Sequence, residues 1–397
     1  MVVRVTKPAF NLRDKLSQLD NPVGAYGGEL LRAKTSQEVS ELVRLNRKNM
    51  IINGQTWINQ RNSTSSWTVP HGTDGNVSTS YGAPDRWGFQ EATDGTLSVN
   101  MDGDCPPEFH NGKSMQIACT GTGALSSSHN AHFYQNIEGY NIRHLKWGTE
   151  YAKPVTLSFW AKTNKGGIYC VGLENNDVNR CNIREFYLRG NVYEWQKIVL
   201  TFKGSSNGTW KISNTIGMRV RFCLASGSNF HVADNEEGTW LAQDELCTPN
   251  QTNFMDNTSN RFFISGIQLE EGTVATPFEH RSYGEELALC QRYYQQIDGT
   301  GDLTPFAFGR ANGSTIAEAS VPLTVPLRGS PTILCAANTA WDDDGGHTSS
   351  TNPGVGRWTA NATVLHVTFS GHSGLTNATA CNVHSSGSSN FTMSSEL

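Results

Sequence analysis

The chain has few charged residues and no long apolar run. Lys, Arg, Asp and Glu make up 17% of its 397 residues, and the formal net charge is −5. A small negative charge lacks the basic footprint of nucleic-acid-binding proteins, so we expect no nucleic-acid partner. Without an apolar stretch of about 20 residues we expect no membrane insertion, and residues 1–7 lack the apolar core of a signal peptide.

The nine cysteines form no C-x-x-C pair and follow no regular spacing. This excludes a zinc ribbon or a thioredoxin-like site and argues against a disulfide scaffold in a chain of this length. We therefore expect buried, reduced thiols. Cys119 illustrates this expectation, because it lies in phase with Met115 and Ile117 as an inward position of a strand.

Motifs of the common catalytic and metal sites are also missing. The sequence contains no G-x-S-x-G elbow, P-loop or H-E-x-x-H pattern. The acidic run 342–344 leads into two glycines and predicts a solvated loop. The stretch 102–104 (Asp-Gly-Asp) could offer oxygens to Ca²⁺ but lacks the ligand series of an EF-hand. We expect no catalytic residue, no metal and no cofactor.

Two acidic pairs could each supply one carboxylate of a glycosidase: Glu174 with Asp177, and Glu236 with Glu237. The sequence assigns no partner across a groove to either pair. Surface charge is the ordinary role of such residues.

Glycine and aromatic residues are abundant. The chain has 39 glycines, and aromatic residues make up 10% of it, including ten tryptophans. Apolar and polar residues alternate along 155–162, 198–203 and 218–224, which predicts strands with one buried face. Because no helical pattern separates these strands, the fold class is mainly β, with an antiparallel sandwich. The loop-rich stretch 225–260 is expected to decorate one end of it.

The first 48 residues have a helical pattern instead. A capping box at Thr35 and Glu38 predicts one short helix. Another is predicted by an apolar stripe before the Asn21-Pro22 break: Phe10, Leu12, Leu16 and Leu19. Two short amphipathic helices bury little surface alone, so they require a partner chain or serve as a cap on the next domain.

A second change of pattern comes at Ser282. Ser282 and Glu285 form a capping box, and the predicted helix, with Leu287, Cys290 and Tyr294 on one face, ends at residues 298–301. Strands are then predicted at 306–308, 321–327, 332–336 and 365–369. We therefore expect three parts: a helical segment at 1–48, a sandwich at 49–281, and a linker helix with a smaller β domain at 282–397.

Two segments resemble a known family. The first is the N-x-I-I-N-G run within 47–54, with Gln60-Arg61 and Asp85-Arg86-Trp87; the second is 267–281, continuing into 286–294. Together with residues 10–13 and 22–24, they resemble tailed-bacteriophage fibre and appendage proteins of marine and freshwater phages. The resemblance implies a jelly-roll sandwich like that of carbohydrate-binding modules, in a virion protein commonly assembled as a trimer.

The tryptophans are the best candidates for ligand binding. Exposed indoles flanked by amides suit sugars, because the ring stacks on the apolar face of a pyranose. Trp195 opens a strand and is expected in the core, while Trp160 points away from its strand's apolar face. The glycan-binding candidates lie in turn-rich surroundings: Trp210, Trp240, Trp67 and Trp147. Packing at a subunit or domain interface is the alternative for each.

These observations predict a non-enzymatic virion fibre or appendage subunit. Its N-terminal stripe would attach to another virion protein, and its β domains would bind a host-surface glycan as a homotrimer. One alternative is an architectural decoration or connector protein without receptor binding. A polysaccharide-degrading tailspike is less favoured, because no β-helix repeat is visible.

Overall fold

The computed structural model describes residues 47–61, 66–72, 80–110, 112–177, 179–190, 194–233, 236–299, 305–335, 339–343, 346–350, 354–360, 364–371, 375–378, 380–385 and 389–397. The predicted N-terminal helices, with the stripe from Phe10 to Leu19, lie outside these residues. Among the described residues, no helix is long and apolar enough to cross a membrane.

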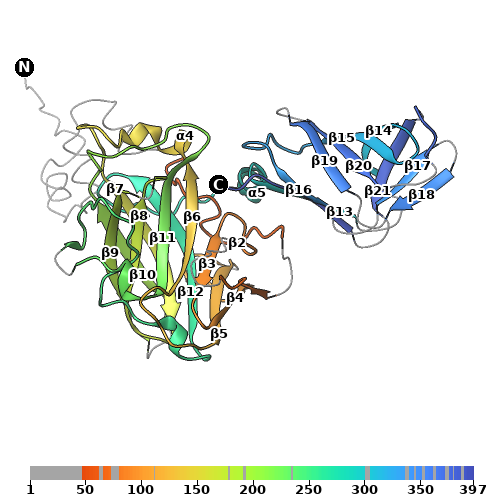
Figure 1. Cartoon of the computed structure of the whole chain (residues 1–397). Helices are drawn as coiled ribbons and strands as arrows, with labels where there is room; N and C mark the ends of the chain where they lie inside the picture. Colours follow the sequence, from red (N-terminus) through yellow and green to blue (C-terminus); the bar gives the residue numbers. More distant parts are fainter. Residues whose placement is uncertain are drawn as a thin grey trace, which may run out of the picture.

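Two six-stranded antiparallel sheets form a jelly-roll sandwich (Figure 1). Sheet A contains, in spatial order, β1 (Trp67–Thr68), β4 (Thr96–Asp102), β5 (Ser114–Gly121), β12 (Arg261–Glu271), β7 (Val155–Thr163) and β10 (Gln196–Phe202). Sheet B contains β2 (Ser80–Tyr81), β3 (Gly88–Ala92), β6 (Asn130–Glu138), β11 (Ile216–Ser226), β8 (Gly167–Glu174) and β9 (Cys181–Leu188). The mainly β fold predicted from period-two patterning is confirmed.

The core of the sandwich is aromatic. Phe133 of β6 and Phe222 of β11 stack with ring centroids 4.8 Å apart, and Phe159 of β7 meets Phe222 edge-on from the opposite sheet at 5.2 Å. All three rings are buried. Each ring occupies an inward position of its strand, so the alternation of apolar and polar residues along the sequence determines which face of each sheet is buried.

Helix α5 (Tyr283–Gln291) follows the sandwich. The Ser282 hydroxyl accepts a hydrogen bond from the backbone N–H of Glu285, as the capping box predicted. The predicted end at 298–301 is wrong. Tyr294 lies in β13 (Tyr294–Gly299) and pairs with Ser394, because pairing with residues 389–394 continues the chain as a strand instead of a helix.

The C-terminal part contains two antiparallel sheets. One has three strands: β13, β22 (Ser389–Ser394) and β16 (Thr332–Cys335). The other has seven: β18 (Gly346–Ser350), β17 (Thr339–Asp343), β21 (Ala380–Ser385), β14 (Pro305–Ala311), β15 (Ile316–Pro322), β20 (Val364–Ser370) and β19 (Gly354–Ala360). Its core combines larger side chains, such as Leu365 and Phe369, with four alanines: Ala307, Ala311, Ala317 and Ala319.

Several local expectations need correction. The strand predicted at 321–327 ends at Pro322, whose ring removes a ladder donor. The acidic run 342–344 is not wholly a loop, because Asp342 and Asp343 pair with His347 and Gly346 in a hairpin. The stretch 225–260 does more than decorate one end: Val232, Leu246 and Cys247 pack on Cys170, Ile183 and Cys223 across the outer face of sheet B.

The end of the described chain returns to the sandwich. Glu396 pairs with Arg61 at 2.9 Å and with the buried Arg86, whose guanidinium lies 3.5 Å from the ring centroid of Tyr293. The Asn136 amide donates to the backbone carbonyl of residue 397 at 2.7 Å. The C-terminal part is therefore held against the sandwich by buried polar contacts as well as by the chain itself.

Candidate functional site

The outer face of sheet A presents two tryptophans, Trp160 in β7 and Trp195 just before the neighbouring strand β10. In β7 the apolar positions face the core, so Trp160 and Lys162 face outward. Trp160 lies opposite Lys197 of β10 and Ser265 of β12. Trp195, just before β10, lies with its ring centroid 5.3 Å from the Lys162 ammonium. Both indoles are half-buried.

A loop between β4 and β5 brings two carboxylates onto this face. The Trp160 indole N–H donates to Glu108 at 2.8 Å, and the Trp195 indole N–H donates to Asp104 at 3.0 Å. Asp104 also pairs with Lys162, and Glu108 lies 3.4 Å from the Lys197 ammonium. We call these six residues the Trp160–Trp195 face: Asp104, Glu108, Trp160, Lys162, Trp195 and Lys197.

Local backbone geometry places this loop. The Asp102 carboxylate accepts from the Asp104 N–H at 2.8 Å, which closes a tight turn at the end of β4. Phe109 is buried against the backbone at Gly266, where a Cβ would lie 2.5 Å from the Phe109 ring and 3.3 Å from Trp160. Gly266 has a φ of +65° and lies in a bulge of β12. Glycine at 266 therefore lets the loop and Trp160 pack closely over the strand.

The electrostatics of the face are balanced. It carries two lysines and two carboxylates, so their formal charges cancel. Partial burial favours a higher pKa for Asp104, but hydrogen bonds from Lys162 and Trp195 outweigh it and hold that pKa below its usual range. Asp104 is therefore ionised at neutral pH and keeps the Trp195 indole oriented.

The structure brings three of the four tryptophans predicted to bind glycans into one cluster. The ring centroid of Trp147 lies 4.6 Å from that of Trp210 and 5.2 Å from that of Trp240, in edge-on contacts. Each indole N–H donates to a backbone carbonyl: Trp147 to Lys153, Trp210 to Asn207 and Trp240 to Lys203. We call these three rings the tryptophan cluster.

The cluster is mostly closed to solvent. Trp147 and Trp210 are each 7% exposed, whereas Trp240 is half-buried, as Trp160 and Trp195 are. Trp67, the fourth candidate, is partly buried, with its ring 5.7 Å from that of Phe89 and packed over Gly82. Trp195, which we expected in the core, lies on the outer face instead, because it is in phase with Lys197 and out of phase with the core residues Leu200 and Phe202.

Three of the acidic residues considered for catalysis or metal binding, Glu174, Glu237 and Asp104, are held in ion pairs. Glu174 is buried between Arg219 and Arg221. Glu237 pairs with Arg184 at 2.8 Å, and Asp104 of the 102–104 stretch pairs with Lys162. Within the described ranges, no group of three His, Cys, Asp or Glu side chains is arranged to hold a metal ion.

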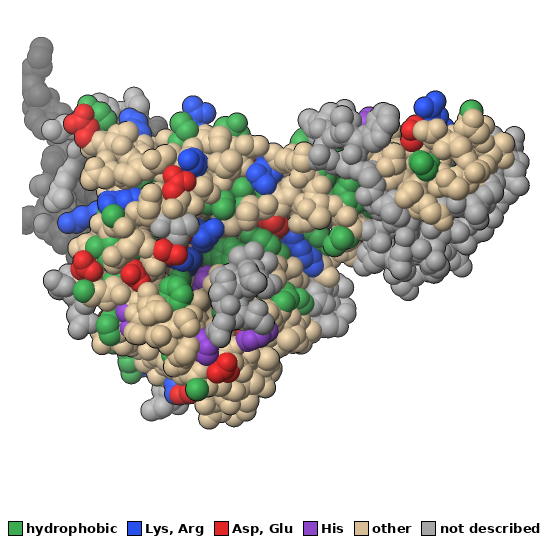
Figure 2. All heavy atoms as spheres, viewed as in Figure 1, with side chains coloured by type: hydrophobic (Ala, Val, Ile, Leu, Met, Phe, Trp, Pro, Cys, Tyr) green, Lys and Arg blue, Asp and Glu red, His purple; other side chains and the backbone are tan. Residues whose placement is uncertain are grey.

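The outer face of sheet B is polar but largely covered. Figure 2 shows basic, acidic and histidine side chains gathered over β6 and β11. His132 and Tyr134 on this face are 3% exposed, and the Arg219 guanidinium lies 5.4 Å from the Tyr134 ring centroid. Burial lowers the pKa of His132 well below its ordinary value, and Arg221 and Arg219 lower it further. The rings of His132 and Tyr134 are therefore less accessible than the indoles of the Trp160–Trp195 face.

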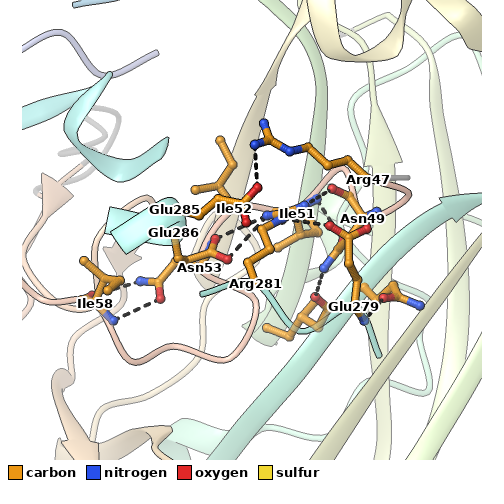
Figure 3. A network of polar contacts seen from close by, with 12 residues as sticks. Arg47, Asn49, Ile51, Ile52, Asn53, Ile58, Glu279, Arg281, Glu285 and Glu286 are labelled. Atoms are coloured by element: carbon orange, nitrogen blue, oxygen red, sulfur yellow. Dashed lines mark hydrogen bonds and ion pairs between the residues drawn. The ribbon is translucent and has the colours of Figure 1, made fainter. Parts of the chain in front are cut away.

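The two segments that carry the family resemblance contact one another (Figure 3). The backbone N–H of Met50 donates to the Leu269 carbonyl at 2.9 Å, so the N-x-I-I-N-G run lies along β12. The Asn49 side chain donates to the Ile267 carbonyl at 3.1 Å and accepts from the Leu269 N–H at 3.0 Å. These contacts extend sheet A beyond the end of β5.

The second segment closes over the first. Glu279 accepts from the Asn49 N–H at 2.8 Å, and Arg281 donates to the carbonyls of Asn49 and Ile51 (Figure 3). The Phe278 ring packs edge-on against the Phe109 ring, with centroids 5.1 Å apart. This contact connects the second segment to the loop that carries Asp104 and Glu108. The resembling residues thus hold the fold and, through Phe109, support the Trp160–Trp195 face.

No protein-family model matches the sequence, and no curated protein matches it. Among solved structures, the chain is similar to the enzymatically active domain of tailspike protein 4 from bacteriophage CBA120, at 10% identity and a TM-score of 0.28 over 56% of this chain. The chain spans only 21% of that tailspike chain.

Carbohydrate-binding modules are also similar. They include TmCBM61 in complex with β-1,4-galactotriose (11% identity, TM-score 0.27), with 57% of this chain and 100% of that module covered. Another is the family 11 module of the cellulosomal cellulase Lic26A-Cel5E of Clostridium thermocellum (12% identity, TM-score 0.26), with 52% and 100% covered. At these TM-scores the similarities assign neither a ligand nor a reaction.

Sequence reasoning missed the acidic part of the site. Alternation in 155–162 already placed Trp160 outside the core, and the same alternation places Lys162 beside it. Nothing local predicted that Asp104 and Glu108, more than 50 residues earlier, would bond the two indoles. That arrangement depends on how the β4–β5 loop folds over the sheet.

Proposed function

We propose that this chain is a non-enzymatic glycan-binding protein and that the Trp160–Trp195 face binds the glycan. The observation that carries the proposal is the pair of half-buried indoles, one in β7 and one just before β10, each fixed by a carboxylate. Indole faces stack on the apolar side of a pyranose, and the exposed carboxylates of Asp104 and Glu108 and the Lys197 ammonium bond its hydroxyls. The buried Lys162 holds Asp104.

The charge balance favours a neutral saccharide. Lys162 and Lys197 are each matched by a carboxylate within the face. An acidic polysaccharide would gain no net attraction from such a surface, whereas a neutral one gains hydrogen bonds from both charge types. We therefore propose neutral segments of a bacterial surface polysaccharide as the ligand class.

We further propose that the glycan-binding chain is a fibre or appendage subunit of a tailed-phage virion. The resemblance of residues 47–54 and 267–281 supports this setting. In it, residues 1–48 attach the subunit to another virion protein, and a homotrimer presents three faces. Repetition raises the effective concentration, so a weak site can still capture a cell.

A glycan array tests the binding function. The purified full chain would be applied to immobilised bacterial capsular polysaccharides, lipopolysaccharides and neutral oligosaccharides. Binding to neutral glycans is expected, without release of reducing sugar. Sugar release would favour a polysaccharide-degrading tailspike, and an array without any binding would favour an architectural protein.

Two further measurements test the virion setting. Light scattering at micromolar concentration should give the mass of a trimer, and a monomer mass would contradict the assembly. Deleting the residues before Thr35 should give a folded protein that is absent from particles. Normal incorporation of the truncated chain would place the anchor elsewhere.

A further inference from the structure

The C-terminal seven-stranded sheet carries a hollow on its exposed face. It has a volume of about 350 Å³ and lies over β14, β15 and β20, with Gly309, Arg310, Glu318, Ser320, His366 and Thr368 among its lining residues. A volume at the low end of the range of small-molecule sites suits one or two sugar rings.

Strand register builds two rows of side chains on this face of the sheet. In one row Phe308, which lies next to the hollow but outside its lining, is opposite Ser320, which is opposite His366; in the next row Arg310 is opposite Glu318. The alternating positions Ala317 and Ala319 enter the core, so the two rows share the outer face. A Cβ at Gly309 would lie 1.8 Å from the Glu318 carbonyl oxygen, so glycine permits the close approach of β14 to β15.

The polar groups of the hollow are held by one another. The Arg310 guanidinium contacts Glu318 through two nitrogens at 3.2 Å each, and the Asn312 amide donates to the other Glu318 oxygen at 2.8 Å. The Ser320 hydroxyl lies 3.0 Å from Nδ1 of His366, which fixes the imidazole. Such prearranged groups bind hydroxyls without first losing side-chain freedom.

An exposed ring flanks these polar groups. Phe308 is 62% exposed, an unusual position for a phenylalanine, and it begins the row that continues with Ser320 and His366. Arg310 and Glu318 cancel in formal charge. An aromatic ring for stacking, beside polar groups whose charges cancel, suits a neutral sugar rather than an anion.

We propose that this hollow is a second saccharide site, which binds a neutral hexose by stacking on Phe308 and by hydrogen bonds to Arg310, Glu318 and His366. It extends the proposed function to a second domain and does not depend on the Trp160–Trp195 face. Two weak sites on one chain would add to the avidity of an oligomer.

Saturation-transfer NMR can isolate this site. The full chain carrying Trp160→Ala and Trp195→Ala would be titrated with glucose, galactose, mannose and N-acetylglucosamine. At least one sugar should show saturation transfer, and adding Phe308→Ala should weaken its binding about tenfold. His366→Ala should weaken it as well. Leu334→Ala, which truncates a side chain 66% exposed on β16, is the matched control and should change nothing.

Two results would overturn the second site. One is that none of the four sugars binds the double tryptophan variant. The other is that sugar binding is unchanged in the Phe308→Ala variant. If light scattering then shows that this variant has a different oligomeric mass, the Phe308 ring is a contact between copies of the chain. Neither result bears on the Trp160–Trp195 face, which is tested by its own variants.

Discussion

The tryptophan cluster and the Trp160–Trp195 face use the same side chain in opposite ways. In the cluster, each indole N–H bonds a backbone carbonyl. The rings pack edge-on, with the centroid of Trp147 lying 4.6 Å from that of Trp210 and 5.2 Å from that of Trp240. On the face, each indole N–H bonds a side-chain carboxylate on an overlying loop, and the rings are half-buried. Turn-rich surroundings therefore do not predict exposure, since Trp147 and Trp210 are buried, whereas the outward phase of β7 correctly predicted that Trp160 lies outside the core.

The largest expected effect is on the stability of the cluster. Trp210→Ala should lower the free energy of unfolding by about 3–5 kcal/mol, because it removes a buried ring that contacts both Trp147 and Trp240. Truncating an exposed ring would cost no more than about 1 kcal/mol. Denaturant unfolding followed by circular dichroism measures the change.

Glycan binding by the Trp210→Ala protein that remains folded should be unchanged. Tyr187→Ala is the control, because it truncates an aromatic ring on β9 that is 61% exposed and should leave the free energy of unfolding nearly unchanged. If Trp210→Ala left stability unchanged but abolished binding, the roles assigned to the two groups of tryptophans would be reversed.

A smaller effect is expected from the glycine beneath the face. Gly266→Ala introduces a Cβ at a positive φ and against the Phe109 ring. The strain should cost about 1–3 kcal/mol of stability, and displacement of the loop should also weaken glycan binding. Gly272→Ala serves as the control, because Gly272 has a positive φ but an added Cβ would meet no atom within 4 Å. Equal binding by both variants would show that the loop does not support the face.

The smallest effect is acid sensitivity of the face. The pKa of Asp104 is lowered by its bonds to Lys162 and Trp195, so the contact is complete above about pH 4 and is lost as the pH falls through the lowered value. The cluster bonds backbone carbonyls, which do not titrate. Glycan binding should therefore be constant from pH 8 to 5 and fall below about pH 4.

Asp104→Asn keeps an acceptor for Trp195 but removes the charge. It should flatten that acidic part of the pH profile while binding at neutral pH changes little. A profile that falls with the same midpoint in this variant would assign the acid sensitivity to another group.

The sequence predicted the fold more completely than the site. Alternation at 155–162, 198–203 and 218–224 identified β7, β10 and β11, and the capping box at Ser282 and Glu285 identified the start of α5. Both signals are local, since they depend on side-chain period and on one turn of helix. The end of α5 was missed because β13 forms by pairing with β22, about 100 residues later.

The site required contacts between distant residues. Asp104 and Trp195 are separated by 91 positions, and Glu108 and Trp160 by 52. No local pattern reports such a contact. Burial of Trp147 and Trp210 likewise depends on three turns meeting at one place, so their turn-rich sequence was a poor guide to exposure.

The central claim is that the Trp160–Trp195 face, rather than the tryptophan cluster, binds the glycan. The most direct test is isothermal titration of an array-positive oligosaccharide into the full chain, the Trp160→Ala/Trp195→Ala variant and the Trp240→Ala variant, with thermal melting as the check on folding. We predict that the double variant binds at least about tenfold more weakly, a loss of about 1.4 kcal/mol or more, and that Trp240→Ala binds as the unaltered chain does. Unchanged affinity in a folded double variant, with a loss in Trp240→Ala, would contradict the account.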